Sequence, residues 1–169
     1  IFTVNAGTFK TELICQDYAS MRYPSWSPDG SKMIFTRYGM PWYRPRYRGS
    51  AASQIWLFDL KEKNRAKLLG DDRQFLFAQF MPDGKNILTV TTGEATPTFA
   101  RLNEKPSKFK DNEKRTPNLW LSNLKGSLRQ LTHFSEDSVR YPTVAAKSGT
   151  IAFEHLDALW LLQRGSTKP

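Results

Sequence analysis

The 169-residue sequence is poor in the residue types on which most enzyme chemistry depends. It has one cysteine and two histidines, and it contains neither a helical His-x-x-x-His pair nor a Cys-x-x-Cys pair, so no metal site is predicted. A Gly-x-Ser-x-Gly nucleophile motif and a glycine-rich phosphate loop are also missing. We therefore predict no catalytic residue and no cofactor or metal ligand in this chain.

The few reactive residue types have structural interpretations. Cys15 lies in or beside a predicted strand and cannot form an internal disulfide, so we expect an inert, buried thiol. His133 and His155 have acidic neighbours in the sequence, but their spacing does not support a metal site. We expect both histidines at strand or turn surfaces, and Ser50, which follows Gly49, in a loop.

Long apolar runs and helix signals are missing as well. No run approaches the roughly 18 residues that span a bilayer, so no membrane span is predicted, and no cleavable signal opens the chain. No stretch combines helical periodicity with capping residues, so we expect little helix. The chain opens on Ile1 rather than on methionine, which favours an excerpt of a longer protein. The compartment, cytoplasmic or periplasmic, is left open.

What the sequence does contain is one pattern repeated three times. An aromatic residue opens a short strand, a turn and a second apolar strand follow, and a tryptophan lies in a later apolar strand. The opening aromatic residues are Tyr23, Phe77 and Tyr141, and the tryptophans are Trp56, Trp120 and Trp160. From Trp120 to Trp160 the period is 40 residues. Four strands in a repeat of roughly 40 residues are typical of a β-propeller blade.

Turn and strand residues agree with this interpretation. Asp29-Gly30 and Asp83-Gly84 predict tight turns between the first and second strands, because glycine tolerates a positive φ. The unbroken apolar runs 55–58 and 159–162 predict strands buried on both faces, as expected where blades stack on each other.

The spacing also predicts how the strands are grouped. The N-terminus follows the same spacing from a third strand onward, so two strands close one unit, two units are complete and three strands open another. We therefore predict an all-β fold, a partial β-propeller of about 13 strands in three and a quarter four-stranded blades. It forms one domain over 1–169, with blade ends near 1–22, 23–76, 77–140 and 141–169. A closed ring takes at least about four blades, so we expect the remaining blades elsewhere in the same protein or in another chain.

Two inserts, 38–53 and 93–116, interrupt the repeat. The first belongs to a stretch with four arginines within twelve residues and no acid, interleaved with aromatic residues. Because propellers bind through loops at the ends of the channel, we predict that this insert contacts a peptide or protein ligand, with arginines anchoring a carboxylate. The predicted binding residues are Trp42, Arg44, Arg46, Tyr47 and Arg48. The alternative is that these aromatic side chains pack the insert onto its own blade.

The net charge of +9 also raises the possibility of nucleic-acid binding. Arginines interleaved with aromatic side chains, as in the first insert, can stack on bases and bind phosphates. The second insert is basic too, but acids offset its cations, which is typical of a solvated excursion. We do not expect nucleic-acid binding, and the absence of oligonucleotide binding at low salt would exclude it.

The first complete copy of the repeat resembles the sequences of a known family. The sequence Tyr-Pro-Ser-Trp-Ser-Pro-Asp-Gly at 23–30, with 32–36 and 55–60, resembles the repeat of TolB-type propellers, which TolB shares with tricorn-type peptidases and prolyl-oligopeptidase relatives. More narrowly, Tyr47-Arg48-Gly49 shortly before Ile55-Trp56 is similar to the N-terminal propeller of tricorn-type serine peptidases. Segments 130–134, 139–142 and 151–160 are similar to its later blades. The insert after Thr92 and the residues 145–148, which replace Ser-Pro-Asp-Gly, depart from the pattern.

The resemblance implies a large, modular peptidase that trims short peptides. In that family the propellers are non-catalytic access channels and substrate filters, and a downstream core holds the catalytic serine and histidine. No segment here matches that core, so no catalytic residue is carried over. The second function considered is a TolB-like envelope scaffold that binds protein partners. A carbohydrate lyase also uses this repeat, but its kind of site needs clustered histidines and a metal, which this sequence does not offer.

Overall fold

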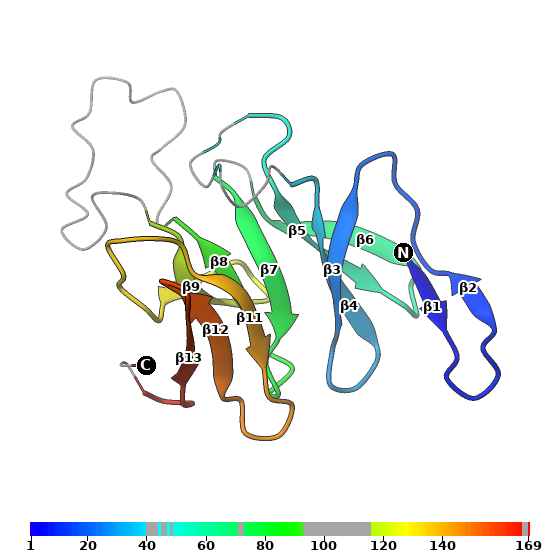
Figure 1. The fold of residues 1–169 in the computed structure, drawn as a ribbon. Helices are drawn as coiled ribbons and strands as arrows, with labels where there is room; N and C mark the ends of the chain where they lie inside the picture. Colours follow the sequence, from blue (N-terminus) through cyan, green and yellow to red (C-terminus); the bar gives the residue numbers. More distant parts are fainter. Residues whose placement is uncertain (40–43, 45–46, 48, 71–72, 93–115, 167–168) are drawn as a thin grey trace.

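The computed structural model describes residues 1–39, 44, 47, 49–70, 73–92, 116–166 and 169. Across these residues the chain is all β, with 13 strands in four antiparallel sheets (Figure 1). This confirms the predicted partial propeller. In the part of the chain so described, no helix is long and apolar enough to cross a membrane.

The four sheets follow one another along the chain. The first sheet pairs β1 (Phe2–Val4) with β2 (Thr11–Leu13). The second sheet has the order β3 (Met21–Trp26), β4 (Lys32–Arg37), β5 (Gln54–Asp59), β6 (Asn64–Leu69). The third sheet has the order β7 (Phe75–Phe80), β8 (Asn86–Thr91), β9 (Asn118–Asn123), β10 (Leu128–Gln130). The fourth sheet has the order β11 (Arg140–Val144), β12 (Ile151–His155), β13 (Ala158–Leu162).

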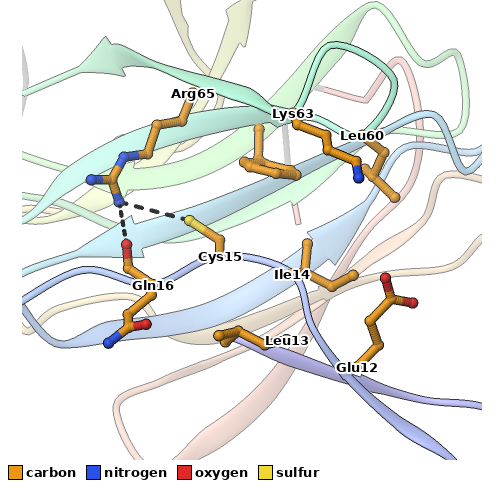
Figure 2. Close-up of a pocket in the computed structure, with 9 residues that line it drawn as sticks. Glu12, Leu13, Ile14, Cys15, Gln16, Leu60, Lys63 and Arg65 are labelled. Atoms are coloured by element: carbon orange, nitrogen blue, oxygen red, sulfur yellow. Dashed lines mark hydrogen bonds between the residues drawn. The ribbon is translucent and has the colours of Figure 1, made fainter.

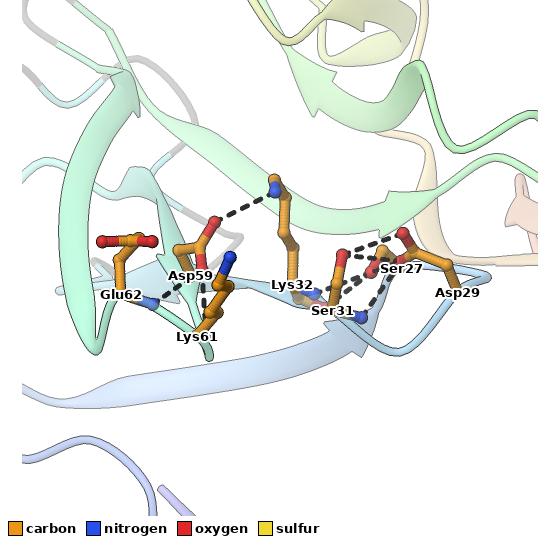
Figure 3. A network of polar contacts seen from close by, with 7 residues as sticks. All are labelled: Ser27, Asp29, Ser31, Lys32, Asp59, Lys61 and Glu62. Carbon is orange, nitrogen blue, oxygen red and sulfur yellow. Dashed lines mark hydrogen bonds and ion pairs between the residues drawn. The ribbon is translucent and has the colours of Figure 1, made fainter.

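The predicted tight turns join the first and second strands of the two complete sheets. Gly30 and Gly84 have φ of 70° and 63°, which glycine adopts without strain. In the first turn the Asp29 carboxylate accepts hydrogen bonds from the Ser27 hydroxyl, at 2.6 Å, and from the Ser31 amide, at 3.0 Å (Figure 3). The Ser27 hydroxyl and the Ser31 amide and hydroxyl hold the pKa of Asp29 at about 2. The aspartate of the Ser-Pro-Asp-Gly motif therefore fixes the turn rather than a ligand.

The aromatic residues that open the repeat form a row where the first strands β3, β7 and β11 lie side by side (Figure 1). The rings of Tyr23 and Phe77 are 4.9 Å apart, and those of Phe77 and Tyr141 are 5.2 Å apart. All three residues have positive φ, between 46° and 54°, at an irregularity in the strand register. Phe77 has a neighbour on each side and is 4 % exposed, whereas Tyr23 and Tyr141 are 42 % and 52 % exposed. The row is therefore part of the contact between sheets.

Polar side chains bond the same strands together two residues further on. Ser25 Oγ accepts the Phe80 amide at 3.1 Å, and Gln79 Oε1 accepts the Val144 amide at 3.0 Å. Ser25 and Gln79 occupy the same position of the repeat, two residues after the aromatic residue. Each first strand is thus hydrogen-bonded to the next through a side chain at a fixed position.

The third strands show where the sheets stack and where they do not. Ile55 and Leu119 occupy equivalent positions and are both 0 % exposed. Ile55 and Phe58 point to opposite faces of β5 and are both buried, as predicted for 55–58. The prediction for 159–162 was wrong: Leu159 is 87 % exposed and Leu161 64 %.

The physical reason is the alternation of side chains along a strand. Leu162 and Trp160 face the third sheet and join its hydrophobic cluster. Leu159 and Leu161 point to the other face of β13, which no described residue covers. The apolar run reflects the repeat, and burial also requires a neighbouring sheet.

Candidate binding surface at the loop end

Both inserts leave the sheets at one end. The strand β3 begins where β4 finishes, because Met21 pairs with Arg37, and β7 begins where β8 finishes, because Phe75 pairs with Thr91. The connections from β4 to β5 and from β8 to β9 start at this end, which we call the loop end (Figure 1). The connections that enter β3, β7 and β11 lie there too. The turns that join first to second strands and third to fourth strands lie at the opposite end.

The structure places two of the five predicted binding residues. Trp42, Arg46 and Arg48 lie outside the described residues. Arg44 is exposed and Tyr47 is half-buried, and the Tyr47 amide donates to the Arg44 carbonyl at 3.1 Å. Most of the second insert, 93–115, also lies outside the described residues.

The base of the first insert is anchored on the entrance to the third sheet. The side chain of Gln74, which is 2 % exposed, donates to the Arg44 carbonyl. The Ser53 hydroxyl donates to Gln74 Oε1 at 3.4 Å. Gln74 therefore links Arg44, within the insert, and Ser53, at its end, to one buried side chain.

Two residues of the motif Tyr47-Arg48-Gly49, the tyrosine and the glycine, pack against each other. Gly49 has φ of 148°, and a Cβ placed on it would lie 2.7 Å from the Tyr47 hydroxyl. The Tyr47 ring thus packs over a backbone position that only glycine leaves open. Tyr47 has a packing role in the insert, whatever else it contacts.

Beside the insert, Asp17 holds two arginines. Its carboxylate receives Arg37 in a bidentate pair, with Nε at 2.9 Å and Nη2 at 3.0 Å, and Arg65 Nη1 at 2.7 Å. The Asp17 side chain is 1 % exposed. Hydrogen bonds from Arg37 and from the Ala19 amide hold its pKa at about 2. The carboxylate is therefore ionised at neutral pH, as a buried partner of two cations must be.

Two tyrosines and a tryptophan surround the Arg37 guanidinium. It lies 5.1 Å from the ring centre of Tyr18, 4.3 Å from that of Tyr38 and 5.2 Å from that of Trp56. The hydroxyls of Tyr18 and Tyr38 are 2.8 Å apart. The hydrogen bond with Tyr38, together with the Arg37 guanidinium, lowers the pKa of Tyr18. Tyr18 is nevertheless 87 % exposed.

The third and fourth sheets have simpler contacts at the position of Arg37. Strand pairing makes Arg37, Thr91 and His155 equivalent, since they face Gln54, Asn118 and Ala158, one residue before the third-strand apolar position. The Thr91 hydroxyl donates to the Gln74 carbonyl at 2.7 Å, and His155 Nε2 lies 2.8 Å from the Glu136 carbonyl. In each sheet the last residue of the second strand is hydrogen-bonded to the connection that precedes the first strand. We call this contact the strand tie.

The strand tie corrects the prediction for His155. This histidine is 3 % exposed and stacks on Phe134, with ring centres 3.8 Å apart and planes at 21°. It is buried because its position in the repeat faces the interior, which its acidic neighbours in sequence do not indicate. His133 is exposed, as predicted. An alignment of the second strands of the repeat could have shown that His155 occupies the same position as Arg37 and Thr91.

Cys15 is buried, as predicted, and lies beside a cavity between the first and second sheets (Figure 2). The cavity volume is about 440 Å³, and its walls include Leu13, Ile14 and Phe58, with Lys63 and Arg65 as cations. Arg65 Nη1 lies 3.7 Å from the Cys15 sulfur and donates to the Gln16 carbonyl at 3.0 Å. Among the described residues, no group of three or more histidines, cysteines or acids gathers as a metal site would require.

No family model and no curated protein sequence matches the chain. Solved structures do match. TolB from Acinetobacter baumannii has 19% identity and a TM-score of 0.65 over 96% of this chain and 34% of its own. An oligogalacturonate lyase in complex with manganese has 15% identity and a TM-score of 0.60 over 98% and 42%. The β-propeller domain of the Trilobed protease from Pyrococcus furiosus has 15% identity and a TM-score of 0.55 over 90% and 41%.

These matches define the class of protein: the described residues form part of a β-propeller. Within that class the chain is similar to TolB-type propellers, in agreement with the sequence resemblance. At these identities the likeness concerns the fold, and the chain spans 34% to 42% of the length of the three structures. Function must therefore be argued from this chain's own surface.

Proposed function

We propose that this chain is the non-catalytic propeller portion of a tricorn-like peptidase, and that its loop end binds peptide substrates or controls their access. The observation that carries the proposal is the fixed group that the buried Arg37, the half-buried Tyr38 and the exposed Tyr18 form at the base of the first insert. The sequence resemblance to tricorn-type propellers and the fold shared with the Trilobed protease propeller support the setting.

The loop end has the chemistry of a binding surface. Tyrosine and arginine are enriched among the residues that dominate protein interfaces, because they combine a large contact area with hydrogen bonding. Arg37 and Tyr38 are held by hydrogen bonds and ring contacts, so a ligand would meet side chains that are already ordered. The stacked sheets below supply a rigid base for loops that differ between repeats.

A second candidate is a TolB-like envelope scaffold that binds protein partners. The TM-score of 0.65 with TolB favours this setting. The same surface would then receive a segment of a folded partner instead of a free peptide. The two settings differ in the parent protein: a full-length gene without a serine peptidase core would overturn the peptidase proposal, and cytosolic fractionation of the native protein would exclude the envelope scaffold.

Peptide binding itself is tested with fluorescein-labelled hexapeptides and fluorescence anisotropy. Replacing Arg44, Arg46 and Arg48 by alanine is expected to weaken hexapeptide binding at least about fivefold, because charge-assisted hydrogen bonds to a carboxylate are lost. The matched control replaces three exposed lysines of the opposite end, Lys61, Lys85 and Lys125. Equal losses in both triple variants would indicate non-specific charge attraction and overturn the proposal. Unfolding of the arginine variant would instead assign these side chains a structural role.

A further inference from the structure

The strand tie of the second sheet contains more side chains than the ties of the third and fourth sheets. One threonine hydroxyl makes the tie in the third sheet, and one histidine makes it in the fourth. In the second sheet, Arg37 and Asp17 make it, and Tyr18 and Tyr38 are added on the solvent side. We infer that Tyr18 and Tyr38 form a recognition site for a carboxylate group of a peptide ligand. This inference rests on the proposed function and extends it to residues outside the predicted set.

Tyr18 is exposed and Tyr38 is half-buried, and yet the pair is fixed. Tyr18 is 87 % exposed, but its hydroxyl lies 2.8 Å from that of Tyr38 and its ring meets the Tyr38 ring edge-on, with centres 6.3 Å apart. Tyr38 has φ of 62° and its amide donates to the Ser20 carbonyl at 2.9 Å. A positive φ at a tyrosine is unfavourable and persists where the surroundings hold it. An exposed side chain of this size held by contacts that the fold does not need points to a ligand.

The hydroxyls leave one donor for that ligand. Each phenol has one hydrogen to donate. The bond between the two hydroxyls uses one of the two hydrogens, and either oxygen could be its donor, so the other hydrogen is left to donate outward. The hydrogen bond with Tyr38 and the nearby Arg37 guanidinium lower the pKa of Tyr18, which makes its hydroxyl a stronger donor. A strong donor that faces solvent fits a hydrogen-bond acceptor on the ligand.

The local charge favours an anionic acceptor. Arg37 and Arg65 share the single carboxylate of Asp17, so these three side chains together keep one positive charge. Arg22 is exposed on β3, which pairs with β4, and adds a further cation nearby. The sequence from Arg37 to Arg48 contains no acid. A carboxylate gains both the hydrogen bond and the attraction of these cations.

A peptide carries a carboxylate at its C-terminus or on an acidic side chain. Three short probes separate these sources: acetyl-Ala-Leu-Ala with a free carboxylate, acetyl-Ala-Glu-Ala amide, and the neutral acetyl-Ala-Gln-Ala amide. Binding is followed by two-dimensional NMR of the whole chain with labelled tyrosine rings. We expect one or both carboxylate probes to bind at least about fivefold more tightly than the neutral probe, and the signals of Tyr18 to shift.

Two variants test the hydroxyls. Tyr18→Phe is expected to weaken binding of the carboxylate probe about fivefold and to leave the neutral probe unchanged, and Tyr38→Phe is expected to have a smaller effect in the same direction. Tyr141→Phe, at an exposed tyrosine of the fourth sheet, is the matched control. Equal affinity for charged and neutral probes, no binding of any tripeptide, or no effect of Tyr18→Phe would overturn the inference. If the inference is overturned but the labelled hexapeptides still bind in an arginine-dependent way, the proposed function stands. If the hexapeptides do not bind in this way, the proposed function is overturned as well.

Discussion

The strand ties of the second and third sheets occupy the same position of the repeat but are made by different chemical groups. In the third sheet, the Thr91 hydroxyl donates one hydrogen bond to the Gln74 carbonyl. In the second sheet, Arg37 pairs with a buried carboxylate and carries two tyrosines on its outer side. Because the simpler tie is enough to hold a second strand to its connection, the larger one shows where the chain has added surface chemistry to a scaffold. Four substitutions test this comparison.

The largest effect is expected at Asp17. Its replacement by alanine leaves Arg37 without its partner in a buried position, and breaking such a pair typically costs about 3–5 kcal/mol of the free energy of unfolding. Urea denaturation monitored by tryptophan fluorescence measures this loss. An Asp17→Ala variant that unfolds within about 0.5 kcal/mol of the wild type would show that the pair is dispensable.

The same carboxylate predicts a pH dependence. Its pKa is about 2 in the folded chain, below the ordinary value of 3.8, so its contribution to stability is complete above about pH 4 and is lost as the pH falls towards 2. The difference in unfolding free energy between the wild type and Asp17→Asn should therefore be constant from pH 5 to 7 and shrink below pH 4. A difference in unfolding free energy that stays constant below pH 4 as well would contradict the ion pair.

His155→Ala is expected to have the next largest effect. It removes the stacking on Phe134 and the hydrogen bond to Glu136 from a side chain that is 3 % exposed, and we expect a loss of about 2 kcal/mol. The control is His133→Ala, at the exposed histidine, which should change the unfolding free energy by less than about 0.5 kcal/mol. If the two variants are equally stable, the tie of the fourth sheet has been misassigned.

Thr91→Val keeps the shape of the side chain and removes one hydrogen bond. The Gln74 carbonyl loses its donor, so the expected loss is about 1 kcal/mol. Thr91→Ser, which retains the hydroxyl, separates this bond from packing of the methyl group. The comparison of ties fails for the third sheet if the valine variant is as stable as the wild type and the serine variant is not.

Tyr18→Ala is expected to change stability least. The side chain is 87 % exposed and the tie between Arg37 and Asp17 does not include it, so the unfolding free energy should change by less than about 0.5 kcal/mol. Thermal and urea unfolding of this variant would be measured beside Tyr38→Ala. A loss above about 2 kcal/mol would make Tyr18 a structural residue and remove the basis for its role in binding.

The sequence was a good guide wherever the repeat determines the structure. The aspartate-glycine turns and the spacing of the tryptophans located the strands and their grouping, because each copy repeats the same local signals. It failed at Leu159 and His155 for opposite reasons. Leu159 is as apolar as Ile55, but its exposure depends on a neighbouring sheet, which no local signal reports. His155 is buried by its register, which shows only after the second strands are aligned.

The candidate site was predicted less well than the fold. The arginine-rich insert leaves the sheets at the end where Tyr18 and Tyr38 lie, and two of its predicted residues, Arg44 and Tyr47, are anchored or packed within it. Their role in binding stays a prediction. Tyr18 was missed because it precedes the first strand and lies 20 residues from Tyr38, its hydrogen-bonding partner. Only strand pairing, which places Met21 beside Arg37, brings the two tyrosines together.

We propose that the sheets are scaffold and that a peptide ligand binds at the loop end of the second sheet. The most direct measurement pairs stability with affinity in one variant, Tyr18→Ala, using urea denaturation and titration with the carboxylate tripeptide. If the proposal is right, the denaturation midpoint stays unchanged and the affinity falls about fivefold or more. A lowered midpoint with unchanged affinity would contradict it.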